Sequence, residues 1–287
     1  MVTRSSRSWC AAAGVVSFLS IAPTGLFAQG SAGAKQTAPP PAAPDLSALP
    51  KAPKIPTTFE ELFTERDRRA RQATGYLRCL QSTVTALRAG ALGQVPRSWA
   101  ITCIDQRGEW RGVFGDLRDN TIDVRRQYAV RGSAGALTTA PVDTARVAGT
   151  ARALLRGLAA PVPGKGQYEI VPVPLPQDNF IEVWFVPAGL KDGRAVVGGD
   201  SLIQMSADGV RELGHGRSTP PIRTLAAQAS GATYELPSLE ERIPSVSELM
   251  LAHATLERVP EVRVLTRQYE SVLRRGTGWT HKKRNPL

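Results

Sequence analysis

The residues from Ile181 to Leu213 constrain the fold most, because a wholly strand-like segment is followed there by closely spaced turn signals. Residues 181–186 are β-branched or aromatic at every position except Glu182, so both faces of the segment are largely apolar. This composition predicts an inner strand of a sheet that is covered on both sides. Pro187 has no backbone N–H to donate to a neighbouring strand, so the strand is predicted to end there.

Turn signals divide the remainder of this stretch into short strands. Asp192-Gly193 and Asp208-Gly209 supply residues that reach positive φ at little cost. Gly198-Gly199 indicates a bulge or a close approach of two backbones. The predicted strands after residue 187 are 195–197, 201–206 and 210–213. The whole stretch is therefore predicted to form an antiparallel meander.

A four-residue sequence in this stretch, Gly199-Asp200-Ser201-Leu202, is identical to the motif that names the GDSL esterases and lipases. In that family the serine is a nucleophile, which needs a base and an orienting carboxylate. The downstream Gly-x-Asn-Asp and Asp-x-x-His blocks of the family have no counterpart, since Asn285 and Asp208 are the only such residues after Ser201. We therefore interpret the match as coincidental and the four residues as a turn between two strands.

The first 28 residues have the organisation of a secretory signal peptide. Arg4 and Arg7 precede an apolar run at 11–22, and Ala28 is the predicted cleavage site, with Ala34 as the alternative. The run of about a dozen residues is too short to span a bilayer. The chain is therefore predicted to be exported, periplasmic or extracellular, with no transmembrane segment after cleavage.

Composition predicts the domain boundaries. Residues 29–56 are rich in Pro and Ala and are predicted to be a disordered tether. The folded domain is predicted at 57–273, with possible halves at 57–160 and 165–273. Residues 274–287 contain five cations and no acid, and they are predicted to be a disordered basic tail.

Two cysteines remain after removal of the signal peptide, Cys79 and Cys103. In an oxidising compartment such a pair is predicted to form a disulfide, with two inert buried thiols as the alternative. The bond would close a loop of about 25 residues and stabilise the fold by about 3–4 kcal/mol. The cysteine spacing matches no zinc site, and Asp116, Asp119 and Asp123 lack calcium-loop spacing, so no metal or cofactor is predicted.

The secondary-structure pattern predicts an α+β fold in which antiparallel meanders are packed by two or three helices. A capping box of Thr57 with Glu60, or Thr58 with Glu61, begins a long helix. A second helix is predicted at 141–158, and the predicted strands around it are 99–103, 110–117, 122–130 and 168–173. Ser245 and Glu248 form a further capping-box pattern, but 247–256 also fits a buried strand. The prediction is a strand pair at 247–256 and 262–273.

Three segments of the central stretch carry a resemblance to a known group of proteins. They are V-W-F-V-P-A, G-R-A-V-V-G-G-D and S-A-D-G-V-R-E-L, all within residues 181–213. This part of the chain resembles a group of uncharacterised exported bacterial proteins that carry a similar hairpin followed by two further strands. The resemblance implies an exported location and strands in 247–273, and it implies no catalytic residue.

The excess of basic over acidic residues bears on the predicted function. The formal net charge is +11, and removal of Arg4 and Arg7 lowers it to +9, a charge that attracts anionic partners. The leading hypothesis is a non-catalytic binding or interaction module whose partner is an anionic envelope polymer or another envelope protein. Nucleic acid is not expected, because the basic run of the first helix lacks interleaved aromatic residues.

Two alternative hypotheses remain. The first is an envelope hydrolase that uses Ser201 with His215 or His253, or the acid pair of Asp200 and Glu182. The second is a polyanion-binding protein that uses the cations of the tail, which are Arg274, Arg275, Lys282, Lys283 and Arg284.

Overall fold

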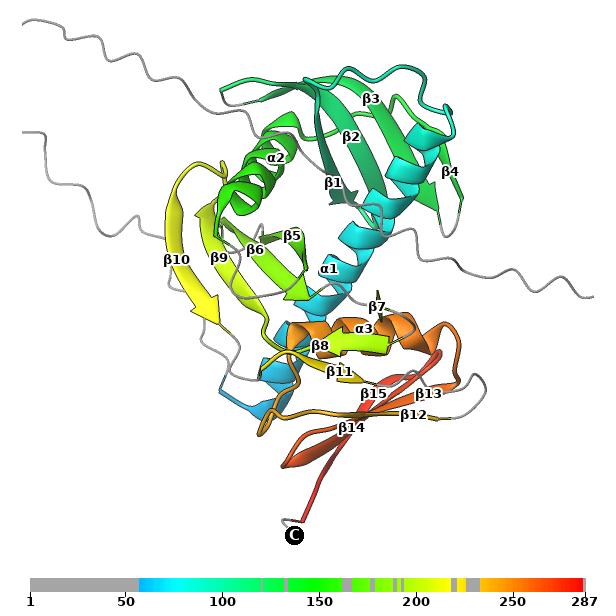
Figure 1. Ribbon diagram of the computed structural model, residues 1–287, viewed down its shortest axis with the longest axis vertical. Helices are drawn as coiled ribbons and strands as arrows, with labels where there is room; N and C mark the ends of the chain where they lie inside the picture. The colour runs from blue at the N-terminus through cyan, green and yellow to red at the C-terminus, as the bar shows by residue number, and fades with distance from the viewer. Residues whose placement is uncertain are drawn as a thin grey trace, which may run out of the picture. The chain divides into compact units, whose positions relative to one another are not determined.

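The computed structural model describes residues 57–285, apart from 120, 132–133, 162–166, 176–178, 188–189, 192–193, 218–220 and 226–232. The predicted signal peptide and tether lie outside the described residues. Residues 55–287 form one unit. Three helices and four mostly antiparallel sheets make up its described part, so the fold is mixed α+β, with more strand than helix (Figure 1).

The helix α1 (Phe59–Arg88) is the longest element of the described chain. The predicted capping box begins it, and the structure selects the pair Thr58 and Glu61. Its apolar face is buried in the main core, where Phe63, Ala73 and Tyr76 are almost inaccessible to solvent. The helix contacts α3 (Val246–Leu256), β5 (Tyr168–Leu175) and a sheet that contains β1 (Ala100–Gln106), β2 (Glu109–Leu117) and β3 (Ile122–Arg131) (Figure 1). It therefore links most of the layers of the unit.

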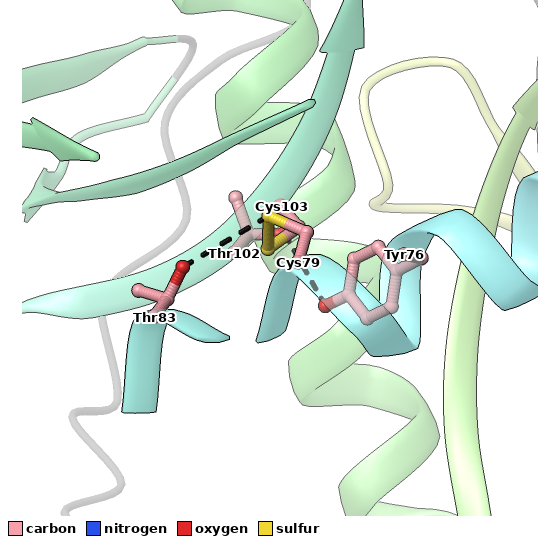
Figure 2. Close-up of a disulfide and its surroundings, with 5 residues drawn as sticks. All are labelled: Tyr76, Cys79, Thr83, Thr102 and Cys103. Atoms are coloured by element: carbon pink, nitrogen blue, oxygen red, sulfur yellow. Dashed lines mark hydrogen bonds between the residues drawn. A yellow bond between two sulfur atoms is a disulfide. The ribbon is translucent and has the colours of Figure 1, made fainter. Parts of the chain in front are cut away.

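The first sheet is the predicted three-stranded meander with one additional strand. Its strands are β1 (Ala100–Gln106), β2 (Glu109–Leu117), β3 (Ile122–Arg131) and β4 (Ala134–Leu137), paired in that order. The disulfide predicted between Cys79 and Cys103 is present, and it joins α1 to β1 (Figure 2). Both cysteines are fully buried.

The second sheet contains the central stretch. Its order is β10-β9-β6-β5, formed by β5 (Tyr168–Leu175), β6 (Phe180–Pro187), β9 (Ser201–Ser206) and β10 (Glu212–Arg217). As predicted, β6 is an inner strand that is buried along nearly its whole length and ends at Pro187. The helix α2 (Thr144–Ala159) covers one face, with Ala153 against Ile181 and Val183.

The predicted meander is wrong at residues 195–197. They lie in β8 (Arg194–Val197), which pairs with β7 (Leu190–Lys191) and β11 (Arg223–Leu225) in a separate sheet. Gly198 and Gly199 both have positive φ, 80° and 67°, a backbone conformation that residues other than glycine rarely adopt. This turn redirects the chain, so that β9 pairs directly with β6.

The fourth sheet corrects the prediction for 247–273. Residues 246–256 form the helix α3 (Val246–Leu256), which the capping box of Ser245 and Glu248 begins. The strands are β12 (Tyr234–Pro237), β13 (Glu261–Leu265), β14 (Tyr269–Arg274) and β15 (Gly278–Lys283). The strand prediction for 247–256 is wrong because β12 and β13 are parallel, and parallel neighbours need a crossover connection, usually a helix.

The prediction of a disordered basic tail at 274–287 is also wrong. Residues 278–283 form β15, which pairs with β14 along its whole length. Trp279 packs edge-on against Phe63, and His281 contacts both Phe59 and Phe63. These aromatic contacts fix the C-terminal strand to the start of α1. In the part of the chain that the structure describes, no helix has the length and apolar character needed to cross a membrane.

Candidate functional site

A cleft of about 590 Å³ opens between α1, α3 and the ends of β2 and β3. Its lining is mainly polar and basic. The side chains that give it chemical character are Arg71, Thr74, Arg78, Glu109, Trp110, Arg131, His253 and Glu257. We take this cleft as the candidate site.

One face of α1 forms a wall of the cleft. Asp67, Arg71, Thr74 and Arg78 follow one another at spacings of four, three and four residues, so they lie in one row along the helix. Asp67 is at the buried end of the row and only 4% exposed, whereas the Arg71 side chain is 60% exposed. The row therefore runs from a buried acid to accessible cations.

Asp67 is the centre of a hydrogen-bond network behind the cleft wall. Its Oδ1 lies 2.6 Å from His253 Nε2 and accepts a hydrogen bond of 2.9 Å from Trp279 Nε1. Arg71 Nε lies 3.0 Å from Oδ2. Burial acts to raise the pKa of Asp67, but the hydrogen bond and charge of His253, the Trp279 hydrogen bond and the charge of Arg71 together lower it. The carboxylate is thus ionised at neutral pH.

This network leaves nitrogen atoms available at the cleft. Because an ionised carboxylate only accepts hydrogen bonds, Nε2 of His253 donates to Asp67, and Nδ1 is the ring nitrogen that makes no contact with the carboxylate. Within the described residues, neither His253 Nδ1 nor the terminal nitrogens of Arg71 make a hydrogen bond, and none of them is buried. Asp67 therefore holds Arg71 and His253 at the cleft and leaves their outer nitrogens free.

The floor of the cleft depends on a close approach between α1 and β2. A Cβ added to Gly75 would lie 2.5 Å from the Trp110 indole, so only glycine allows the ring to pack against the helix. Cys79 also lines the cleft, and its disulfide to Cys103 ties α1 to the sheet at this point (Figure 2). The Tyr76 hydroxyl lies 3.5 Å from Thr102 Oγ1 beside the disulfide, and burial raises the pKa of Tyr76 to about 12.

The remaining arginines of the cleft have acidic partners at its rim. Arg78 forms an ion pair with Glu257, and Arg131 Nη2 lies 2.9 Å from Glu109. Arg131 is 82% exposed, and both Arg78 and Glu257 are largely exposed. The Arg78–Glu257 pair is exposed at both ends, and such pairs contribute only about 0–1 kcal/mol, so a ligand anion can replace Glu257 at low cost.

Ser201 lies away from this cleft, at the start of β9, where it pairs with Phe185 and Arg217 in the sheet. In the described part of the chain its hydroxyl has no hydrogen bond to a histidine or a carboxylate. Each histidine has another partner: His215 pairs with Glu212, His253 with Asp67 and His281 with Ser271. The structure does not bring Ser201 together with a base.

The acid pair of the hydrolase hypothesis is also committed to other contacts. Glu182 is buried and accepts hydrogen bonds from Arg69, at 2.6 and 2.9 Å, and from Trp184. Asp200 is fully buried, and its Oδ2 accepts the backbone N–H of Ser247 at the start of α3, at 2.8 Å. Its Oδ1 is buried without a partner in the described chain. Burial and the nearby Glu248 charge raise the pKa of Asp200 to about 6.

The five cations predicted to bind polyanions do not form one cluster. Arg274 donates to Glu261, Arg275 donates to the carbonyls that end α3, and Arg284 donates to the Thr266 carbonyl. Lys282 and Lys283 are exposed. Arg274 is opposite Gly278 at one end of β15, and Lys282 and Lys283 are at the other end, about 15 Å away at the rise of a strand.

The sequence-based predictions named two cleft residues for other roles, Cys79 as a disulfide cysteine and His253 as a candidate base, and missed the others. The row of Asp67, Arg71, Thr74 and Arg78 was visible in the sequence as a polar helical stripe. Trp110, Arg131 and His253 carried no comparable signal, because they come from three other elements that only the fold brings to α1. In the described residues no group of three or more histidine, cysteine or acidic side chains is placed to hold a metal ion.

Comparison with known proteins finds no matching family model, no match among curated proteins and no match among solved structures. What can be assigned is a structural class. The chain forms a disulfide-linked α+β domain with an arginine-lined cleft between its longest helix and a crossover helix.

Proposed function

We propose that this chain is an exported, non-catalytic binding module of the cell envelope, and that the α1–α3 cleft binds an acidic polysaccharide. The observation that carries the proposal is the arrangement around Asp67. One buried carboxylate holds Arg71 and His253 at the cleft wall while their outer nitrogens stay free. Preorganised donors of this kind bind an anion with little loss of side-chain freedom.

The chemistry of the lining favours carboxylated sugars. A guanidinium presents its N–H groups as a fork that matches the two oxygens of a carboxylate. Trp110 gives the same cleft a flat apolar surface for the face of a sugar ring. The remaining polar lining, including Thr74 and Glu257, offers partners for hydroxyl groups.

Two further observations support an exported and non-catalytic role. The Cys79–Cys103 disulfide is the type of bond that persists in oxidising compartments outside the cytoplasm. Nucleophilic catalysis needs a hydroxyl or thiol beside a base. In the described chain, no serine, threonine or cysteine side chain is hydrogen-bonded to His253, and Thr74 Oγ1 is bonded to the Ala70 carbonyl.

A titration with a carboxylated disaccharide tests the proposal. The purified chain from residue 29 onward is titrated with digalacturonic acid, and binding is measured by calorimetry at low salt. Arg71→Ala and Arg78→Ala should each weaken binding about tenfold, the effect expected for loss of a hydrogen bond to a charged group. Arg156→Ala, an exposed arginine on α2 away from the cleft, is the matched control and should bind as the wild type does.

Neutral maltose should not bind, because it offers no charge to the arginines. No binding of digalacturonic acid, or equal affinities for Arg71→Ala and Arg156→Ala, would overturn the proposal. Stronger binding of poly-L-glutamate than of an equally long galacturonate would replace the polysaccharide by an acidic protein partner.

A further inference from the structure

We infer that the ligand lies across the β1–β2 turn as an extended polyanionic chain, so that the binding site continues from the α1–α3 cleft into a second cleft, with Arg107 contacting the chain between the two. This inference rests on the proposed function and adds the length of the ligand and a binding residue to it.

The second cleft has a volume of about 440 Å³ and is lined by Gln106, Arg107, Glu109, Arg111, Ala140 and Pro141. Glu109 lines both clefts. Gly108 lines the first cleft, and Arg107, its neighbour in the turn, lines the second. The two clefts therefore meet at the β1–β2 turn, and a chain of several sugar units could occupy both.

The charged side chains at this junction differ in how far their contacts within the fold leave them free to bind a ligand. Glu109 accepts hydrogen bonds from Arg111 on the side of the second cleft and from Arg131 on the side of the first. The hydrogen bonds from Arg111 and Arg131 lower the pKa of Glu109, so it is ionised and partly neutralises both arginines. Arg111 also donates to the carbonyls of Ala140 and Pro141, so its guanidinium is engaged by the fold.

Arg107 is the cation at the junction that the fold does not engage. It is exposed, and its guanidinium has no ion pair or hydrogen bond with the part of the chain that the structure describes. Its charge is therefore free to meet an anionic group of a ligand that passes from one cleft to the other.

The backbone at Arg107 costs stability. Arg107 has φ 57° and Gly108 has φ 82°, and the two residues connect a pair formed by Gln106 and Glu109. Such a two-residue hairpin turn strongly prefers Asn-Gly, because asparagine tolerates positive φ better than arginine does. The unfavourable residue at this position is explained if its side chain binds a ligand.

The second cleft also contains a hydrogen-bond acceptor that the fold does not use, as expected of a site that binds a ligand. Gln106 Oε1 is buried and has no partner within the described residues. A buried acceptor without a partner is costly. A small rotation of the amide would present it to a sugar hydroxyl in the cleft.

The test is a substitution that separates stability from binding. Arg107→Asn should raise the melting temperature by a few degrees, because it relieves the backbone strain. It should also weaken binding of hexagalacturonic acid about tenfold and leave binding of digalacturonic acid unchanged. Arg107→Lys, which keeps the charge and the strained backbone, is the matched control and should keep most of the affinity for the hexamer.

The outcomes distinguish the inference from the proposed function. If digalacturonic and hexagalacturonic acid bind equally well, the inference of an extended ligand is overturned. It is also overturned if Arg107→Asn binds hexagalacturonic acid as the wild type does. In both cases the proposed binding in the α1–α3 cleft is unaffected. If Arg71→Ala has no effect on either probe, or neither probe binds, the proposed function fails and the inference fails with it.

Discussion

At the scale of single residues, the buried carboxylates determine how the segments are joined. Asp67 connects α1 to His253 of α3 and to Trp279 of β15. Asp200 connects the turn after β8 to the start of α3 through the Ser247 backbone N–H. The Gly-Asp-Ser-Leu sequence thus contributes its aspartate, rather than its serine, to the contacts between elements.

Asp200 predicts a measurable pH dependence of stability. An ordinary aspartate has a pKa near 3.9, and in the folded chain the pKa of Asp200 is about 6. A raised pKa means that the folded state disfavours the ionised form, so this group lowers stability as the pH rises from about 4 to about 6. The loss is complete above that range and amounts to up to about 3 kcal/mol.

The asparagine of Asp200→Asn cannot ionise, so the variant should lack this loss of stability. Urea unfolding at pH 4.5 and pH 7.5 should show a larger loss for the wild type than for the variant. Burial also raises the pKa of Glu169, but that contribution is common to both chains and cancels in the comparison. Identical losses in the two chains would contradict the assignment.

At the scale of secondary structure, the pairing of α1 with the first sheet forms the floor of the cleft. Tyr76 and Cys79 of α1 face Thr102 and Cys103 of β1, as Figure 2 shows. Removing the disulfide by Cys79→Ala with Cys103→Ala should reduce the free energy of unfolding by about 3 kcal/mol, because the unfolded chain regains the entropy of the open loop.

The change is measured as the shift of the urea midpoint, with the wild type under reducing conditions as the control that keeps both thiols. The double variant should also bind digalacturonic acid less tightly, since α1 carries the cleft wall. A double variant as stable as the oxidised wild type would show that the bond does not constrain α1.

At the scale of the whole unit, the C-terminal strand is part of the core of the fourth sheet and of the site. Trp279 donates to Asp67 and packs against Phe63, so β15 supports the network that orients His253. Truncation after Leu273 should therefore abolish cooperative thermal unfolding, whereas loss of a disordered tail would leave it unchanged.

Circular dichroism of the truncated chain is the measurement. Lys282→Ala with Lys283→Ala is the matched control, because it removes exposed charges and leaves the aromatic contacts intact. Its stability should lie within about 1 kcal/mol of the wild type, as expected for two surface substitutions. A truncated chain that melts like the full chain would contradict the role of β15.

Local patterns predicted a large part of the elements. A capping box at Thr57 or Thr58, the meander at 99–130 and the inner strand at 181–186 follow from capping chemistry and from side-chain periodicity within a few residues. The disulfide followed from an even cysteine count. None of these inferences needed to know which segments are neighbours in space.

The sequence by itself thus determined the long capped helix, the first meander and the inner strand at 181–186, and it favoured pairing of the two cysteines. Only the tertiary structure decided that 246–256 is a helix, that 278–283 is a strand and that His253 contacts Asp67. A short apolar run suits either a helix or a strand, and its neighbours decide. The parallel pairing of β12 with β13 requires a crossover, and the aromatic contacts with α1 offset the entropy of ordering the basic C-terminal segment.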